Sequence, residues 1–146
     1  MNEESNKRQH KEQLYQLFAR IATAIANPHR LELLDLLVQA PRTVEELAQE
    51  AGMSIGNTSQ HLQRLKQARL VTAAREGVYI RYRLAAPVVA RLWLQLRAVA
   101  GQQLSEVEQA LDAYRDRRSV QRISAHLQLR CLTQWRAGAA TSVSAR

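Results

Sequence analysis

The sequence predicts a mainly α-helical protein with one small β-hairpin. Apolar residues recur at three- and four-residue steps through most of the chain, which is the pattern of amphipathic helices. Two short helical segments between residues 43 and 68 meet at a turn that contains Gly52, and a segment of alternating character follows over residues 70–84. Helix, turn, helix and hairpin in this order form a winged helix-turn-helix.

Length and composition fit one globular domain. The chain has 146 residues, of which 46% are hydrophobic, and this suffices for a single core. Residues 1–10 are polar and without period, so we expect a disordered N-terminus there. We expect the winged, dimeric domain over residues 11–118, an additional helix over 119–136 and a disordered tail over 137–146.

Two helices precede the motif. The first begins at Lys11 and has a single apolar face of about four turns. Asn27 suits the N-cap of the second helix, and Pro28 suits its first position. The second helix, over residues 29–38, should bury Leu31, Leu34, Leu37 and Val38.

Capping residues mark both helices of the motif. Thr43 and Glu46 have the spacing of a capping box, and Gly52 ends the first of these helices. Ser54 caps a second helix that continues to about residue 68. The buried stripe of this second helix should consist of Thr58, Leu62 and Leu65.

The hairpin consists of a strand over residues 70–74, a turn over 75–77 and a return strand over 78–84. Side chains alternate between the two faces of a strand. The face of the return strand that should pack on the core holds Ile80, Tyr82 and Leu84. The opposite face holds Tyr79, Arg81 and Arg83.

Positive charge is concentrated on this motif. The formal net charge is +8, and six basic residues against one acidic residue give residues 51–86 a charge of +5. A basic patch alone is more often a solvated surface. Its coincidence with the motif favours double-stranded DNA as the partner, because the phosphates would lie there.

The exposed residues at the start of the second motif helix are candidates to contact bases. Amide side chains can pair with adenine, a hydroxyl can bond to several bases, an apolar group can touch the thymine methyl, and glycine permits close approach of the backbone. Exposed polar residues on a helix are usually only solvated, but the motif favours base contact. We predict base contacts from Ile55, Gly56, Asn57, Ser59 and Gln60.

Other residues of the motif suit the DNA backbone, and the tip of the wing suits the minor groove. The predicted phosphate and wing contacts are Thr43, Arg64, Lys66, Arg75, Gly77, Tyr79, Arg81 and Arg83. His61 lies next to Leu62 of the buried stripe. We therefore expect His61 to be packed or bonded to the backbone rather than to act as a ligand.

A long helix opens at Pro87 and its apolar pattern continues for about 30 residues, which makes a helix of about 45 Å. A small core cannot cover that length. The uncovered apolar stripe, together with the N-terminal helix, predicts a homodimer interface, and a long solvent-exposed helix is the alternative. The predicted interface contains Leu14, Leu17, Phe18, Ile21, Leu92, Trp93, Leu96, Val99, Leu104 and Val107.

Several segments together resemble the ArsR/SmtB family of bacterial winged-helix repressors. They are the segment from Asn27 to Leu34, the segment from Thr43 to Ala48, the SIGNTSQHLQRL segment of residues 54–65, and the hairpin of residues 70–84. The resemblance covers about residues 12–115. It implies a homodimer that binds a palindromic operator, reads DNA through Gly56, Ser59 and Gln60, and is released by a ligand or a chemical signal.

The chain departs from the metal sensors of that family. Arsenic and cadmium sensors have two cysteines where this chain has Thr43 and Glu45, which supply no thiolate to a soft metal. Zinc and nickel sensors have Asp and His pairs on the last long helix, and this chain has no histidine between residues 87 and 118. We therefore predict no metal site and no cofactor.

Cys131 is the remaining candidate sensor of a redox signal, and it is the single cysteine of the chain. A buried, inert cysteine is the usual case. A dithiol switch would need Cys131 of a second subunit, and Arg130 would lower the thiol pKa if both are exposed. Trp93 and Trp135 are candidates to line a pocket for an apolar effector.

The leading hypothesis is a cytoplasmic, homodimeric repressor that binds a palindromic operator and responds to a small-molecule or redox effector. The alternative is a winged-helix dimer that binds protein and does not read DNA. We do not expect an enzyme, since no catalytic motif is visible. No apolar run approaches the ~20 residues of a membrane-spanning helix.

Overall fold

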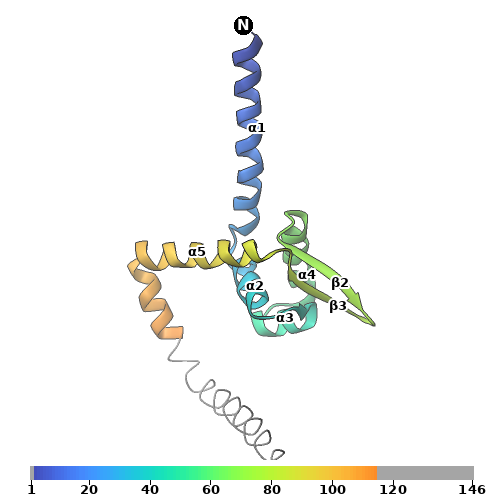
Figure 1. Ribbon diagram of the computed structural model, residues 1–146. Helices are drawn as coiled ribbons and strands as arrows, with labels where there is room; N and C mark the ends of the chain where they lie inside the picture. Colours follow the sequence, from blue (N-terminus) through green and yellow to red (C-terminus); the bar gives the residue numbers. More distant parts are fainter. Residues whose placement is uncertain (1, 115–146) are drawn as a thin grey trace, which may run out of the picture. The chain divides into compact units, whose positions relative to one another are not determined.

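The computed structural model describes residues 2–114, which fall into two units, the first ending at Arg97 and the second beginning at Ala98. The elements, in chain order, are α1 (Asn2–Ile25), α2 (Pro28–Gln39), β1 (Arg42–Thr43), α3 (Val44–Ala51), α4 (Ile55–Gln67), β2 (Val71–Glu76), β3 (Tyr79–Leu84) and α5 (Pro87–Gln103) (Figure 1). The predicted class, mainly helical with a small hairpin, is confirmed.

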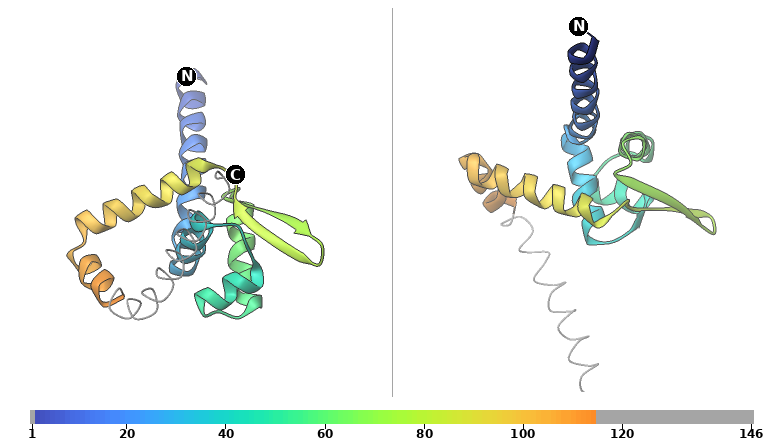
Figure 2. Two further views of the ribbon diagram at one scale, coloured as in Figure 1. Left: turned by 60° about the horizontal axis from the view of Figure 1, so that its bottom comes forward. Right: turned by 45° about the horizontal axis from the view of Figure 1, so that its top comes forward.

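The first unit contains a three-stranded antiparallel sheet with the strand order β1-β3-β2. The two longer strands pair from Val71 opposite Leu84 to Glu76 opposite Tyr79. In both views of Figure 2 this hairpin extends away from the helices. The sequence does not predict β1, because two residues are too few to show alternation.

The core of this unit lies between α2, α3, α4 and the base of the hairpin. Its most deeply buried side chains include Leu33, Leu47, Leu62, Leu65 and Val71. They come from all four of these elements, so the hydrophobic effect holds the helices and the wing together through one cluster. The predicted stripe of α4 is confirmed, since Thr58, Leu62 and Leu65 are each 0% exposed.

The predicted caps are present. The Thr43 hydroxyl accepts a hydrogen bond from the Glu46 amide at 3.3 Å, and the Thr43 amide donates to Glu46 Oε2 at 2.7 Å. Gly52 ends α3 with φ of 64°, a conformation that favours glycine. Ser54 caps α4 by accepting a hydrogen bond from the Asn57 amide at 3.2 Å.

The N-terminus corrects one expectation. The sequence predicts disorder over residues 1–10, whereas α1 begins at Asn2 and continues as one helix to Ile25. Glu3 and Glu4 in the first turn interact favourably with the positive end of the helix dipole. They also lie four residues before Lys7 and Arg8, a spacing at which opposite charges attract on one helix face. Such charge spacing stabilises a helix without an apolar period, so a search for periodicity misses it.

Helix α2 buries a wider face than its spacing predicts. Leu33 and Leu36 are buried together with Leu34 and Leu37, while Leu31 is only half-buried. Val38, expected inside, is also half-buried. The reason is that α2 packs against α3, α4 and β3, so neighbours cover it on more than one side.

The hairpin is longer than predicted at its tip. Arg75 and Glu76 pair with Ile80 and Tyr79, so they belong to β2 rather than to the turn. Gly77, with φ of 64°, and Val78 make the connection. Ile80 is 48% exposed and not packed on the core, because the hairpin extends beyond the helices at this point.

The single long helix predicted after Pro87 is interrupted. Helix α5 ends at Gln103, Leu104 is not helical, and a further helical stretch covers residues 105–114. Gly101 lies in the last turn of α5 and favours a helix end, since glycine lowers helix propensity. Cys131, Trp135, the helix predicted over 119–136 and the tail over 137–146 lie outside the described residues.

His61 of α4 packs against His29 of α2, with ring centroids 5.3 Å apart. This contact agrees with a packed rather than a ligating histidine. Burial lowers the pKa of His61, and the charges of His29 and Arg30 lower it further. Within residues 2–114, no helix is both long and apolar enough to cross a membrane.

We expect Thr43→Ala to lower the free energy of unfolding by about 1 kcal/mol, the usual value of a helix N-cap. The substitution removes the hydroxyl that accepts the Glu46 amide. Urea denaturation followed by circular dichroism measures the change. Thr23→Ala, at an exposed position of α1, is the matched control and should stay within about 0.5 kcal/mol of the wild type. Equal effects of the two substitutions would contradict the role of the cap.

The lowered pKa of His61 predicts a pH dependence of stability. The unfolded chain binds the proton more readily than the folded chain, so unfolding becomes easier as pH falls from the unfolded value of about 6.5 toward the lower folded value. Above the unfolded value this contribution to stability is fully present. In His61→Gln the fall over this window should be smaller, as measured by urea denaturation at pH 5 to 8. An unchanged pH profile in the variant would exclude His61 as the cause.

Candidate nucleic-acid interface

The first turns of α4 present the five predicted base-contacting residues together. Burial of Thr58, Leu62 and Leu65 fixes the rotation of this helix, so its opposite side faces outward. Asn57 and Gln60 are exposed, Ile55 is 53% exposed and Ser59 is half-buried. Polar amides, a hydroxyl and an apolar side chain therefore share one outward surface at the start of the helix.

Gly56 lies in the middle of this surface. Apart from the neighbouring backbone of α4, a Cβ at this position would have no described atom within 4 Å. The fold therefore does not require glycine at this position. Its small size leaves the α4 backbone open to close approach by a molecule from outside.

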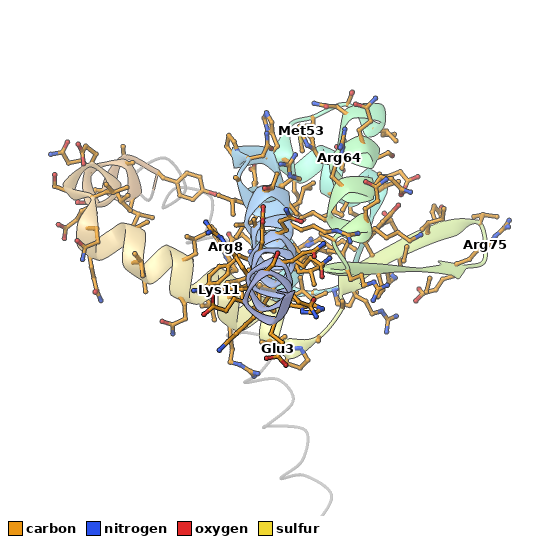
Figure 3. All side chains as sticks on the ribbon, turned by 90° about the horizontal axis from the view of Figure 1, so that it is seen from above. Glu3, Arg8, Lys11, Met53, Arg64 and Arg75 are labelled. Carbon is orange, nitrogen blue, oxygen red and sulfur yellow. The ribbon has the colours of Figure 1, made fainter. Side chains whose placement is uncertain are left out.

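The wing places a second basic element beside α4. Arg75 lies near the far end of the hairpin (Figure 3), and its Nε donates a hydrogen bond to the Gly77 carbonyl at 3.2 Å. Tyr79 is 56% exposed and Val78 is 85% exposed. Val78 is an exposed apolar residue at the tip that the sequence does not single out, because its position in the turn follows only from the strand register.

Arg81 has a different environment from the one its position in the sequence suggests. Its Nε donates to Glu76 Oε2 at 2.7 Å, and its Nη1 donates to the Pro41 carbonyl at 3.3 Å. Glu46 of α3 is 3.8 Å away, and the hydrogen bond to Glu76 is the main cause of the raised pKa of Arg81. Arg81 thus links the wing to the start of α3. Arg83, which is 3.7 Å from Glu76, remains half-exposed.

Three other residues predicted to contact the DNA backbone have different environments. Thr43 is only 7% exposed, and its hydroxyl accepts the capping-box hydrogen bond from the Glu46 amide. Lys66 is exposed in the last turn of α4. Arg64 is exposed as well, but it lines a groove beside α1 together with Arg20 and Arg30. The sequence gives no sign of this grouping, because the three arginines belong to three separate helices.

Apolar side chains are exposed on α1. Leu14 is 47% exposed, and Leu17 and Phe18 are each 59% exposed. The Tyr15 ring stands edge-on to Phe18 at 5.9 Å between centroids. Ile21, predicted at the same surface, is half-buried against the core. Residues 14–18 of α1 therefore carry apolar surface that no other part of residues 2–114 covers.

The rest of the predicted interface lies on α5, except for Leu104 and Val107, which follow the end of α5 at Gln103. Leu92 and Leu96 are 38% and 37% exposed in the first unit, while Val99 and Leu104 of the second unit are 56% and 52% exposed. The remaining members are Val107, which is half-buried, and Trp93. Trp93 is half-buried and its Nε1 donates to Asp35 Oδ1 at 2.8 Å, so this indole contacts α2 of its own chain.

Within residues 2–114, no three His, Cys, Asp or Glu side chains are grouped closely enough to hold a metal ion.

Comparison with known proteins gives a consistent result. Residues 27–73 match the model of the bacterial regulatory protein, arsR family. The chain is 45% identical over 89 residues to the HTH-type transcriptional regulator Rv0324 of Mycobacterium tuberculosis. The aligned segment is 61% of this chain but only 39% of that protein. It is 38% identical over 96 residues to the uncharacterized HTH-type transcriptional regulator Rv0081 of the same organism, covering 65% of this chain and 84% of that protein.

Solved structures agree with the sequence relatives. The homodimeric winged helix-turn-helix DNA-binding domain of Mb0332 from Mycobacterium bovis, a possible ArsR-family transcriptional regulator, superimposes with a TM-score of 0.62 at 44% identity, covering 64% of this chain and 87% of that one. NolR from Sinorhizobium fredii gives a TM-score of 0.59 at 33% identity, covering 63% and 92%. The chain therefore belongs to the ArsR family of bacterial regulatory proteins.

Proposed function

We propose that this protein is a sequence-specific DNA-binding transcriptional repressor. The observation that supports the proposal most directly is the outward surface of α4, where Ile55, Gly56, Asn57, Ser59 and Gln60 are brought together beside the basic wing. Asn57 and Gln60 have the amide groups that pair with adenine in the major groove. The DNA backbone and the minor groove would be contacted by Lys66, Arg75, Gly77, Tyr79 and Arg83.

We propose that the protein acts as a cytoplasmic homodimer. The exposed apolar side chains of α1 and α5 supply a surface that a second copy would cover, and the Mb0332 domain is homodimeric. Two-fold symmetry would place two copies of α4 about 34 Å apart, on successive major grooves of a palindromic operator. Binding of an effector would release the dimer from the operator.

The first experiment selects genomic fragments that the protein retains and measures operator affinity at 50 and 200 mM salt. If about 6–10 phosphates are neutralised, affinity should fall by about 10³–10⁵-fold between these concentrations. Arg75→Ala should weaken binding to all sequences and reduce the salt slope by about one. A flat salt profile, or no retarded fragment, would favour the alternative of a dimer that binds protein instead of DNA.

Gln60→Ala should weaken operator binding by about 1–3 kcal/mol and relax the choice of base at one position of each half-site. The amide is exposed on α4 and its loss leaves the buried stripe intact. Fluorescence anisotropy with operator and random DNA separates this effect from a general loss. Gln13→Ala on α1 is the control with the same change of side chain. An equal loss on operator and random DNA would contradict a base contact by Gln60.

A further inference from the structure

An open groove of about 700 Å³ lies between α1, the start of α2 and the C-terminal half of α4. One arginine from each helix lines it, namely Arg20, Arg30 and Arg64, and none of the lining residues within 2–114 is acidic. Figure 3 shows Arg64 on the α4 ribbon next to α1. The volume is within the range of sites that hold small molecules, about 300–1,000 Å³.

Two of the three guanidinium groups are held by main-chain oxygens. Arg20 Nη2 donates to the Gln67 carbonyl at 3.1 Å, so it links α1 to the end of α4. Arg30 Nη2 donates to the Thr23 carbonyl at 3.2 Å and its Nε donates to the Ala24 carbonyl, so it links α2 to the end of α1. A guanidinium has five N–H groups, and these bonds therefore orient both groups while most of their donors stay free.

Within the described residues, no carboxylate pairs with the three arginines of the groove. The carbonyls that accept from Arg20 and Arg30 belong to the C-terminal turns of α4 and α1, and each helix end supplies about half a negative charge. The three guanidinium groups carry three positive charges, and the two helix ends together offset about one of them. The groove therefore has an excess of about two positive charges.

We propose that this groove binds a small anion with two or three negative charges on carboxylate or phosphate groups. Guanidinium groups bind both kinds of oxyanion through paired hydrogen bonds. A bound anion would contact α1, α2 and α4 at once, and Arg64 belongs to the same helix as the proposed base-contacting residues. The groove is thus the effector site of the regulator, and this regulatory role rests on the proposed function.

A free anion and a DNA phosphate share this chemistry. The groove favours the free anion, because its three arginines come from three helices and two of them, Arg20 and Arg30, belong to helices outside the helix-turn-helix. The experiment therefore begins without DNA. Citrate and inorganic phosphate are the probes, and sodium chloride at equal ionic strength is the reference.

The variant is Arg64→Gln, because this substitution breaks no ion pair within residues 2–114. The matched control is Arg91→Gln, which removes an equal charge from an exposed position of α5. We expect citrate well above its Kd to raise the Tm of the wild type and of Arg91→Gln by roughly 5 °C or more. In Arg64→Gln the rise should fall to about half or less, and titration calorimetry should show weaker citrate binding.

A second measurement tests the effector role. At constant ionic strength, citrate should change the operator affinity of the wild type and of Arg91→Gln but not that of Arg64→Gln. An equal citrate response of all three proteins, or none, would overturn the proposal. If Arg64→Gln instead weakens DNA binding and reduces the salt slope by about one, with no citrate response in any protein, the groove holds a DNA phosphate and the proposal is wrong.

The two proposals can fail separately. Should the protein bind no DNA, the proposed repressor function fails, while the Tm and calorimetric measurements still decide whether the groove binds an anion.

Discussion

Helix α4 has three side chains with no exposed surface, Thr58, Leu62 and Leu65, and they lie on one stripe. Burying a leucine contributes roughly 1.5–3 kcal/mol. The Thr58 hydroxyl donates to the Ser54 carbonyl at 2.9 Å, so the one polar group of the stripe is satisfied. Rotation of α4 about its axis would expose all three. The outward direction of Asn57 and Gln60 is therefore a consequence of core packing, not of any property of those two residues.

The wing depends on the same core at its base and on polar contacts along its length. Val71 and Tyr82 are buried where the hairpin leaves the helices, whereas Val78 and Ile80 toward the tip are exposed. Between these ends, Arg81 links Glu76 of the wing with Pro41 and Glu46 at the start of α3. Exposed ion pairs contribute little each, but this set also includes a hydrogen bond to a main-chain carbonyl. The result is a wing fixed in direction at its base and free to contact other molecules at its tip.

Much of the fold is predictable because its signals are local. The capping box at Thr43, the left-handed Gly52 and the cap at Ser54 each lie within a few residues of the helix end that they define. The outward residues of α4 follow from the same local pattern. The helical N-terminus of α1 is less predictable, since charge spacing rather than apolar period supports it.

The roles of several arginines are not predictable from the sequence, since they depend on residues distant in the chain. Arg81 reaches Pro41, which is 40 positions away, and Arg20 reaches Gln67, which is 47 positions away. The amino-acid sequence shows where the basic residues are, but it does not show which residues they contact in the fold. The sequence predicts phosphate contacts for both Arg81 and Arg64, and it does not show that Arg81 bonds to Glu76 and Pro41 or that Arg64 lines a groove beside α1.

The hydrogen bond from Trp93 to Asp35 has a mechanical consequence. It joins α5, which bears exposed apolar residues, to α2, which packs against α4, and Arg97 lies 3.9 Å from the same carboxylate. A hydrogen bond to a charged group contributes about 1.5–3 kcal/mol. Helix α5 therefore cannot roll about its long axis without breaking this joint or moving α2 with it. Rotation of α5 would therefore also displace α2, through the indole of Trp93 and the guanidinium of Arg97.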